Sequence, residues 1–165
     1  ALPDLKQAGV QLIWQTGTPY FEQAQEAANA INYAACTVLE FVARMDLAYA
    51  VADLVVSRAG AISVSELSLV QLPAILVPLP TAAEDHQTRN ARALTNRGAA
   101  VLVRDDRATA ELGREILRLV NDAPERERLR IAISAMSTTN AAEAIAVEVI
   151  RLARGSVERK MEGHE

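Results

Sequence analysis

Short apolar runs alternate with amphipathic segments along most of the chain. Runs rich in Val, Ile, Leu and Ala, which are typical of strands covered on both faces of a sheet, occupy residues 10–14, 37–41, 53–57, 74–77 and 99–103. Segments of helical character lie between them, at residues 2–8, 20–29, 45–52, from 63 onward and at 84–97. Because strands alternate with helices, we expect an α/β fold with a parallel sheet flanked by helices.

The last third of the chain shows helical spacing only. From residue 108 onward we expect three helices, the last of them capped by Thr139 or Asn140 and ending near residue 154. Residues 155–165 are polar and predict a disordered tail. The sequence therefore predicts one domain at residues 1–154 followed by a short tail.

Residues 53–80 form the most informative unit, a strand, a small-residue turn at 58–62, a helix and a second strand. Ser63 is followed three residues later by Glu66, a capping box that predicts Ser63 as the helix N-cap. Such a unit aims a helix N-terminus out of the carboxyl edge of the sheet, where free N–H groups and the helix dipole suit a diphosphate. Gly60 would let a ligand approach the backbone, although an ordinary turn of any doubly wound fold has the same local pattern.

The composition is that of a single globular domain. Of 165 residues, 50% are hydrophobic and 23% charged, while only 4% are aromatic, so we expect an aliphatic core. The net charge of −4 argues against a nucleic-acid-binding module, which usually has a basic face. No apolar run reaches the roughly 18 residues of a membrane span, and the start of the chain lacks a signal-peptide pattern.

Cysteine and histidine are sparse. Cys36 is the single cysteine and lies in an apolar run, so we expect a buried thiol without chemistry. His86 and His164 lie far apart in the sequence. We therefore expect neither a metal site nor a resident cofactor.

The chain also carries a series of short motifs in a fixed order. The longest is SRAGAISVSE at residues 57–66, and His86 and Gln87 follow it. The other motif residues are Gln15, Thr16, Gly17, Phe41, Val42, Met45, Ala52, Asp53, Leu72, Pro73, Val77, Pro78, Asp85, Asn90 and Ala91. From about residue 9 to 154 the chain thus resembles the C-terminal half of the MurG-type transferases. These enzymes add N-acetylglucosamine to a lipid-linked muramyl pentapeptide.

The resemblance implies a fold and a ligand. The fold would be a Rossmann-like parallel sheet flanked by helices, with C-terminal helices, as one half of a GT-B glycosyltransferase. The ligand would be the donor UDP-N-acetylglucosamine, and the residues assigned to it are Phe41, Val42, Met45, Ala61, Ile62, Ser63, Glu66, His86 and Gln87. Of these, Phe41 and Val42 would border the uracil, with the Val42 backbone reading its edge, and Met45 would lie close by. Phe41 also ends an apolar run, which leaves a plain core position as the alternative.

The same resemblance assigns the helix that follows Gly60 to the diphosphate and the ribose. Its first amides, from Ala61 to Ser63, and the Ser63 hydroxyl would face the diphosphate. Glu66 would accept hydrogen bonds from the ribose hydroxyls, and a carboxylate suits a vicinal diol because it offers two acceptor oxygens. One carboxylate would then serve either the ribose or the capping box, and the resemblance favours the ribose.

His86 and Gln87 would contact hydroxyls of the sugar ring. For His86 the alternative is a solvated position on a polar helical turn. Arg58 could pair with a neighbouring carboxylate.

The resemblance also implies parts that lie outside this chain. A glycine-rich phosphate loop and a first strand would precede Ala1, and the chain starts without Met, so we expect a processed product or an excised piece. The N-terminal half would hold the lipid-linked acceptor, the catalytic base and the membrane-facing surface, so we expect no catalytic residue here. The full-length enzyme would be an inverting transferase of peptidoglycan synthesis, needed for cell shape and division. It would be peripheral on the cytoplasmic side of the inner membrane, and this piece would be soluble and inactive alone.

Two other functions agree with the same residues. The chain could be the donor domain of another UDP-sugar transferase or of an epimerase, with the Glu66 site kept and the sugar contacts changed. It could also be a non-catalytic nucleotide-binding subunit that docks a membrane partner.

Overall fold

The computed structural model describes residues 1–80, 85–136 and 150. Its strands are β1 (Leu12–Gln15), β2 (Cys36–Leu39), β3 (Val55–Ser57), β4 (Ala74–Leu76) and β5 (Val101–Leu102). Its helices are α1 (Leu2–Gln7), α2 (Phe21–Ala30), α3 (Met45–Val51), α4 (Ala61–Val70), α5 (His86–Thr95), α6 (Ala108–Val120) and α7 (Ala123–Ser134), with 3-10 turns η1 (Thr18–Tyr20) and η3 (Asp105–Arg107). The alternation of strands and helices predicted from the sequence is confirmed.

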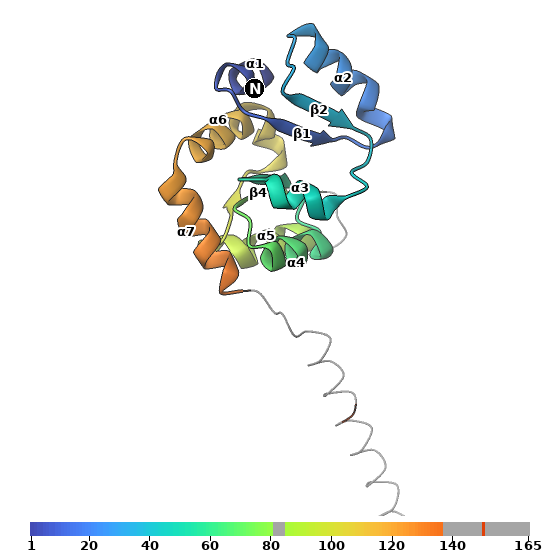
Figure 1. Ribbon diagram of the computed structural model, residues 1–165. Helices are drawn as coiled ribbons and strands as arrows, with labels where there is room; N and C mark the ends of the chain where they lie inside the picture. Colours follow the sequence, from blue (N-terminus) through green and yellow to red (C-terminus); the bar gives the residue numbers. More distant parts are fainter. Residues whose placement is uncertain (81–84, 137–149, 151–165) are drawn as a thin grey trace, which may run out of the picture.

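All strand pairs are parallel, and they fall into two sheets (Figure 1). β1 pairs with β2, while β4 lies between β3 and β5. β1 and β3 therefore each pair along one edge only within the described residues. The parallel α/β architecture was predicted, but its division into two sheets was not, because an apolar run identifies a strand without identifying its neighbours.

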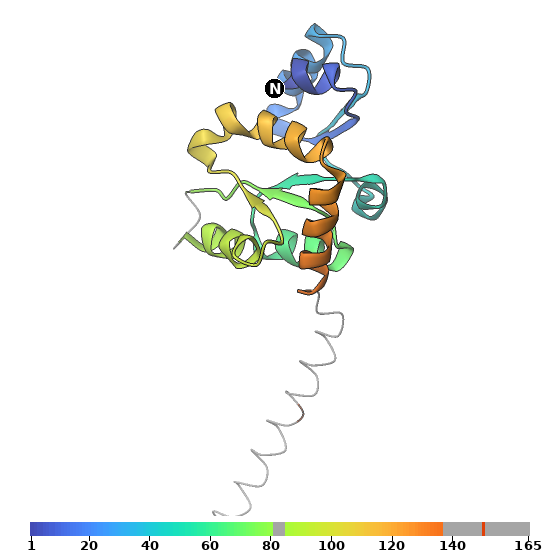
Figure 2. The ribbon, with the colours of Figure 1, turned by 90° about the vertical axis from the view of Figure 1, so that its left-hand side faces the viewer.

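The central strand of the three-stranded sheet, β4, is buried on both faces. Figure 2 shows the strands of this sheet between α6 on one side and α4 and α5 on the other, with α7 running past them. Successive residues of β4 point to opposite faces, so Ala74 and Leu76 join one core cluster while Ile75 and Val77 join the other. Every buried residue of both clusters is aliphatic, as the low aromatic content predicted.

Several predicted element ends are confirmed. Gly9 and Gly98 follow α1 and α5 in the left-handed region, with φ of 69° and 66°. A non-glycine residue there is strained, so these two positions favour glycine. α7 starts with Pro124 in its first turn, and the Asp122 side chain accepts a hydrogen bond from the Glu125 amide at 3.0 Å. The final helix expected near residue 154 and the tail at 155–165 lie outside the described residues.

Two predictions about single residues need correction. Cys36 is half-buried rather than buried, because it opens β2, which among the described residues pairs with β1 alone. Burial still raises the pKa of its thiol. Phe41 is 73% exposed, because β2 ends at Leu39 and the chain has already turned into a loop, so the core alternative for Phe41 is wrong.

Across the described parts of the chain, no helix is long and apolar enough to cross a membrane. In those same residues, no group of three or more His, Cys, Asp or Glu side chains is arranged to hold a metal ion.

Candidate functional site

The N-terminus of α4 is open and lies where β3 ends. Gly60 is its N-cap, and no side chain caps it. The first intrahelical bond runs from the Val64 amide to the Gly60 carbonyl at 3.0 Å. The amides of Ala61, Ile62 and Ser63 therefore have no partner in the described part of the chain, and Ile62 is 76% exposed. Three such donors at the positive end of a helix form a site for an anion.

The predicted capping box is wrong. The N-cap is Gly60, three residues before the predicted Ser63, so Ser63 is the third residue of the helix and Glu66 its sixth. The competition between cap and ribose for Glu66 is thereby removed. Gly60 has φ of −61° and ψ of 150°, which any residue adopts. What the glycine provides is the absence of a side chain above the open amides.

Two side chains of α5 hold the loop that leads into α4. The Ala59 amide donates to Gln87 Oε1 at 3.2 Å, and Asn90 Nδ2 donates to the Ala59 carbonyl at 3.0 Å. Gln87 Oε1 also accepts the Leu79 amide at 3.0 Å. Ala59 is completely buried, so this pair of bonds satisfies backbone groups that water cannot reach. We call Gln87, Asn90 and Ala59 the loop clamp.

The loop clamp bears on the predicted role of Gln87. An amide oxygen has two lone pairs, and both are taken by the amides of Ala59 and Leu79. A sugar hydroxyl would then meet the NH2 group of Gln87 and not its oxygen. The contact with the sugar stays a prediction.

Arg58 ties the carboxyl ends of the three-stranded sheet together. Its guanidinium donates to the Val77 carbonyl at 3.2 Å and forms an ion pair with Asp105, which lies in η3 just after β5. Pairing of Arg58 with a carboxylate was one of the sequence interpretations, and it is confirmed. The arginine thus supports the edge from which α4 starts.

The loop between β2 and α3 holds the residues predicted to border the uracil. Val42 is buried, and its amide donates to Gln15 Oε1 at 2.8 Å. Met45 is half-buried and opens α3. The Val42 amide could donate to the edge of a uracil only after it had given up its hydrogen bond to Gln15.

α3 and α4 meet through a hydrogen bond that the sequence did not predict. The Tyr49 hydroxyl donates to Glu66 Oε2 at 3.1 Å. Burial, together with the hydrogen bond to Glu66 and its negative charge, raises the pKa of Tyr49 to about 12. Tyr49 lies four residues after Met45 on α3, one helical turn further along the same face, and this spacing was the only signal that could have pointed to it.

His86 is exposed and is the first residue of α5. This position puts it one residue before the loop clamp. Its predicted contact with the sugar is untested.

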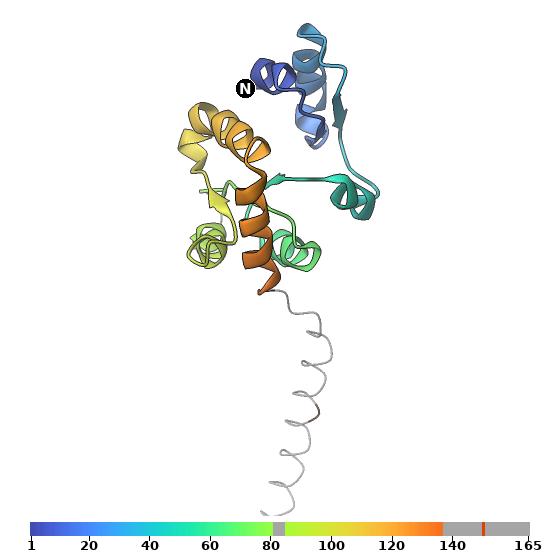
Figure 3. The same ribbon diagram turned by 60° about the vertical axis from the view of Figure 1, so that its left-hand side comes forward.

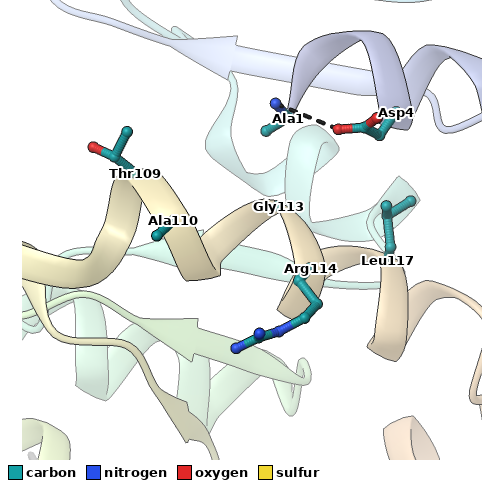
Figure 4. Close-up of a pocket in the computed structure, with 7 residues that line it drawn as sticks. All are labelled: Ala1, Asp4, Thr109, Ala110, Gly113, Arg114 and Leu117. Atoms are coloured by element: carbon teal, nitrogen blue, oxygen red, sulfur yellow. Dashed lines mark ion pairs between the residues drawn. The ribbon is translucent and has the colours of Figure 1, made fainter.

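A separate pocket lies between α1 and α6 (Figure 4). Its lining includes the charged side chains Asp4 and Arg114, with Ala1, Thr109, Ala110, Gly113 and Leu117. Figure 3 shows α1 beside α6, with α4 elsewhere in the fold. None of the residues assigned to the donor lines this pocket, so the open N-terminus of α4 remains the candidate site.

Comparisons with known proteins identify the family. The model of the glycosyltransferase family 28 C-terminal domain matches residues 1–147, so the chain belongs to glycosyltransferase family 28 and corresponds to its C-terminal domain. A relative from Porphyromonas gingivalis is 49% identical over 146 residues. That protein is named UDP-N-acetylglucosamine–N-acetylmuramyl-(pentapeptide) pyrophosphoryl-undecaprenol N-acetylglucosamine transferase. A relative of the same name from Cytophaga hutchinsonii is 43% identical over 151 residues.

The match covers only part of each relative. It includes 88% and 92% of this chain but 38% and 40% of the two relatives. Among solved structures, MurG of Acinetobacter baumannii superposes with a TM-score of 0.77 at 33% identity, over 91% of this chain and 44% of that one. The Rossmann-like fold implied for one half of a GT-B enzyme is thereby confirmed.

Proposed function

We propose that residues 1–154 are the donor-binding domain of an inverting glycosyltransferase. The full-length enzyme transfers N-acetylglucosamine from UDP-N-acetylglucosamine to the lipid-linked muramyl pentapeptide of peptidoglycan synthesis. The names of the relatives support this reaction. The structural observation that carries the proposal is the open N-terminus of α4, with its three unpartnered amides and with Glu66 one turn beyond Ser63.

The chemistry follows from where charge develops. A base in the other half of the enzyme deprotonates the acceptor hydroxyl, which attacks the anomeric carbon of the sugar, and UDP leaves as a diphosphate. In this proposal the amides of Ala61, Ile62 and Ser63 face the place where this charge appears. Donors fixed in advance stabilise such a leaving group without reorganisation.

The rest of the donor extends from α4 in two directions. Towards α3, Glu66 accepts hydrogen bonds from the ribose hydroxyls, and Phe41, Val42 and Met45 border the uracil. The exposed ring of Phe41 is available to cover the base, since it contributes nothing to the core.

Towards α5, the NH2 group of Gln87 and the side chain of His86 contact the N-acetylglucosamine ring. These residues follow Asp85 at the start of α5, and Gln87 is itself part of the loop clamp.

The cellular role follows from the reaction. The acceptor is a membrane lipid, so the full-length enzyme works as a peripheral protein at the cytoplasmic face of the inner membrane and supports cell shape and division. This chain holds the donor while the N-terminal half holds the acceptor and the base. The chain alone therefore binds UDP-sugar without turning it over.

An NMR titration of the chain with UDP, UDP-N-acetylglucosamine and UDP-glucose tests the proposal. We expect UDP to shift the amides of Val42, Ile62 and Ser63, and Glu66→Ala to weaken binding. Glu26→Ala is the matched control, because Glu26 is an exposed glutamate on α2. A preference for the N-acetylated sugar would favour this transferase over one that uses another UDP-sugar.

Absence of saturable shifts, even when the upstream segment of the relatives precedes the chain, would refute the donor-binding role. Sugar transfer by the chain alone would refute the division of labour between the two halves.

A further inference from the structure

The carboxylate of Glu66 is held from outside its own helix. Glu66 is exposed on α4, and the Tyr49 hydroxyl on α3 donates to its Oε2 at 3.1 Å. In the described ranges no other hydrogen bond reaches this carboxylate. The contact joins residues 17 positions apart, so it depends on how α3 packs against α4.

The ring of Tyr49 is itself anchored. Tyr49 is half-buried and packs against the core cluster that contains Ala59, Leu67 and Leu76. The hydroxyl therefore reaches Glu66 from a fixed ring and not from a mobile surface side chain. An exposed glutamate without such a partner samples several rotamers, and a ligand that needs one of them must bear the entropy of ordering it.

The geometry leaves room for a ligand on the same carboxylate. An ionised carboxylate offers about four acceptor positions on its two oxygens. Tyr49 occupies one of them, so two vicinal hydroxyls can still donate to the others. The Tyr49 hydroxyl, whose pKa is raised to about 12, is protonated and thus a donor throughout the neutral range, as an ordinary tyrosine also is.

We propose that Tyr49 is a positioning residue that holds the Glu66 carboxylate in the orientation in which it accepts the ribose hydroxyls. This inference rests on the proposed donor-binding function. It makes recognition of the ribose depend on α3, the same helix whose first turn carries Met45 beside the base. Tyr49 touches Glu66 and not the ligand.

The test uses Tyr49→Phe, which removes the hydroxyl and keeps the ring that packs in the core. Tyr20→Phe is the matched control, since Tyr20 is 65% exposed and lies in η1. Isothermal titration measures the Kd of each variant for UDP and for 2′,3′-dideoxy-UDP, which lacks both hydroxyls. Glu66→Ala and the Tyr49→Phe/Glu66→Ala double variant complete a double-mutant cycle.

We expect Tyr49→Phe to raise the Kd for UDP about 5- to 10-fold, the effect of one net hydrogen bond. The affinity of Tyr49→Phe for the dideoxy analogue should equal that of the wild type. Tyr20→Phe should bind both UDP and the dideoxy analogue as the wild type does. In the Glu66→Ala background, Tyr49→Phe has no further effect. A general structural defect would weaken both ligands equally, and that result would overturn the inference.

The two proposals fail in different ways. If Glu66→Ala weakens UDP but Tyr49→Phe does not, Tyr49 is not a positioning residue and the donor site stands. If Glu66→Ala has no effect, or if the wild type binds UDP and its dideoxy analogue equally, the ribose site is wrong and the inference falls with it.

Discussion

The loop clamp makes a quantitative prediction about stability. Asn90→Ala removes the donor to the Ala59 carbonyl, and Ala59 is completely buried. A buried carbonyl that loses its partner costs about 1–3 kcal/mol of the free energy of unfolding. For a chain of this length that loss lowers Tm by about 2–12 °C. The same change frees the loop before α4, so UDP should bind more weakly as well.

Urea denaturation followed by circular dichroism measures the change in unfolding free energy, with UDP titration alongside. Arg92→Ala is the control, because Arg92 is an exposed residue of the same helix, and it should stay within about 0.5 kcal/mol of the wild type. If Asn90→Ala loses no more stability than Arg92→Ala, water reaches the Ala59 carbonyl and the loop clamp does not fix the loop.

Four other predictions test the site. Gly60→Ala should leave the unfolding free energy within about 0.5 kcal/mol of the wild type, because a poorer N-cap offsets a less flexible unfolded chain. It should nevertheless lower the affinity for UDP, because it places a methyl group over the open amides. An affinity for UDP equal to that of the wild type would contradict this. Gln87→Glu keeps an oxygen that can accept from the amides of Ala59 and Leu79, so the midpoint of urea denaturation should not change. It removes the NH2 group that would contact the sugar, so titrations should show no preference for UDP-N-acetylglucosamine over UDP. The pKa of Tyr49, followed by absorbance, should be about 12. In Glu66→Gln it should fall but stay above its ordinary value, because burial, the largest cause of the shift, remains. Since the native state holds this proton more tightly, the stability it adds is complete below pH 10 and lost as the pH rises through 12. A pKa that Glu66→Gln leaves unchanged would contradict the hydrogen bond. The NMR signals of the Gln15 side-chain amide should shift on UDP binding, because the uracil replaces Gln15 as the partner of the Val42 amide. Unchanged signals would mean that the uracil lies elsewhere.

The fold was predictable from the sequence because its signals are local. β4 and its neighbours are short aliphatic runs, and such runs identify buried strands without any tertiary information. Gly9 and Gly98 mark helix ends through a backbone conformation that glycine favours. The error at the start of α4 arose because two local signals compete. Ser63 and Glu66 have the spacing of a capping box, but Gly60 ends an extended stretch and starts the helix earlier.

The contacts of the site were not predictable, because they join distant parts of the chain. Gln87 reaches Ala59 across 28 residues, and Val42 reaches Gln15 across 27. The motifs marked these residues as important without saying what they touch. Gln87 was predicted to contact a sugar, and only the structure shows that its oxygen is already committed to two backbone amides.

These contacts divide the candidate site into groups that are ready for a ligand and groups that are occupied. Among the described residues, the amides at the start of α4 have no protein partner to lose, whereas the Val42 amide must first release Gln15. A ligand gains more from an unpartnered donor than from one whose bond is merely exchanged. Most of the affinity for UDP should therefore come from the diphosphate and the ribose, while the uracil contributes selectivity through the exchange at Val42. Uridine, which keeps the base and the ribose but lacks the diphosphate, should accordingly bind far more weakly than UDP.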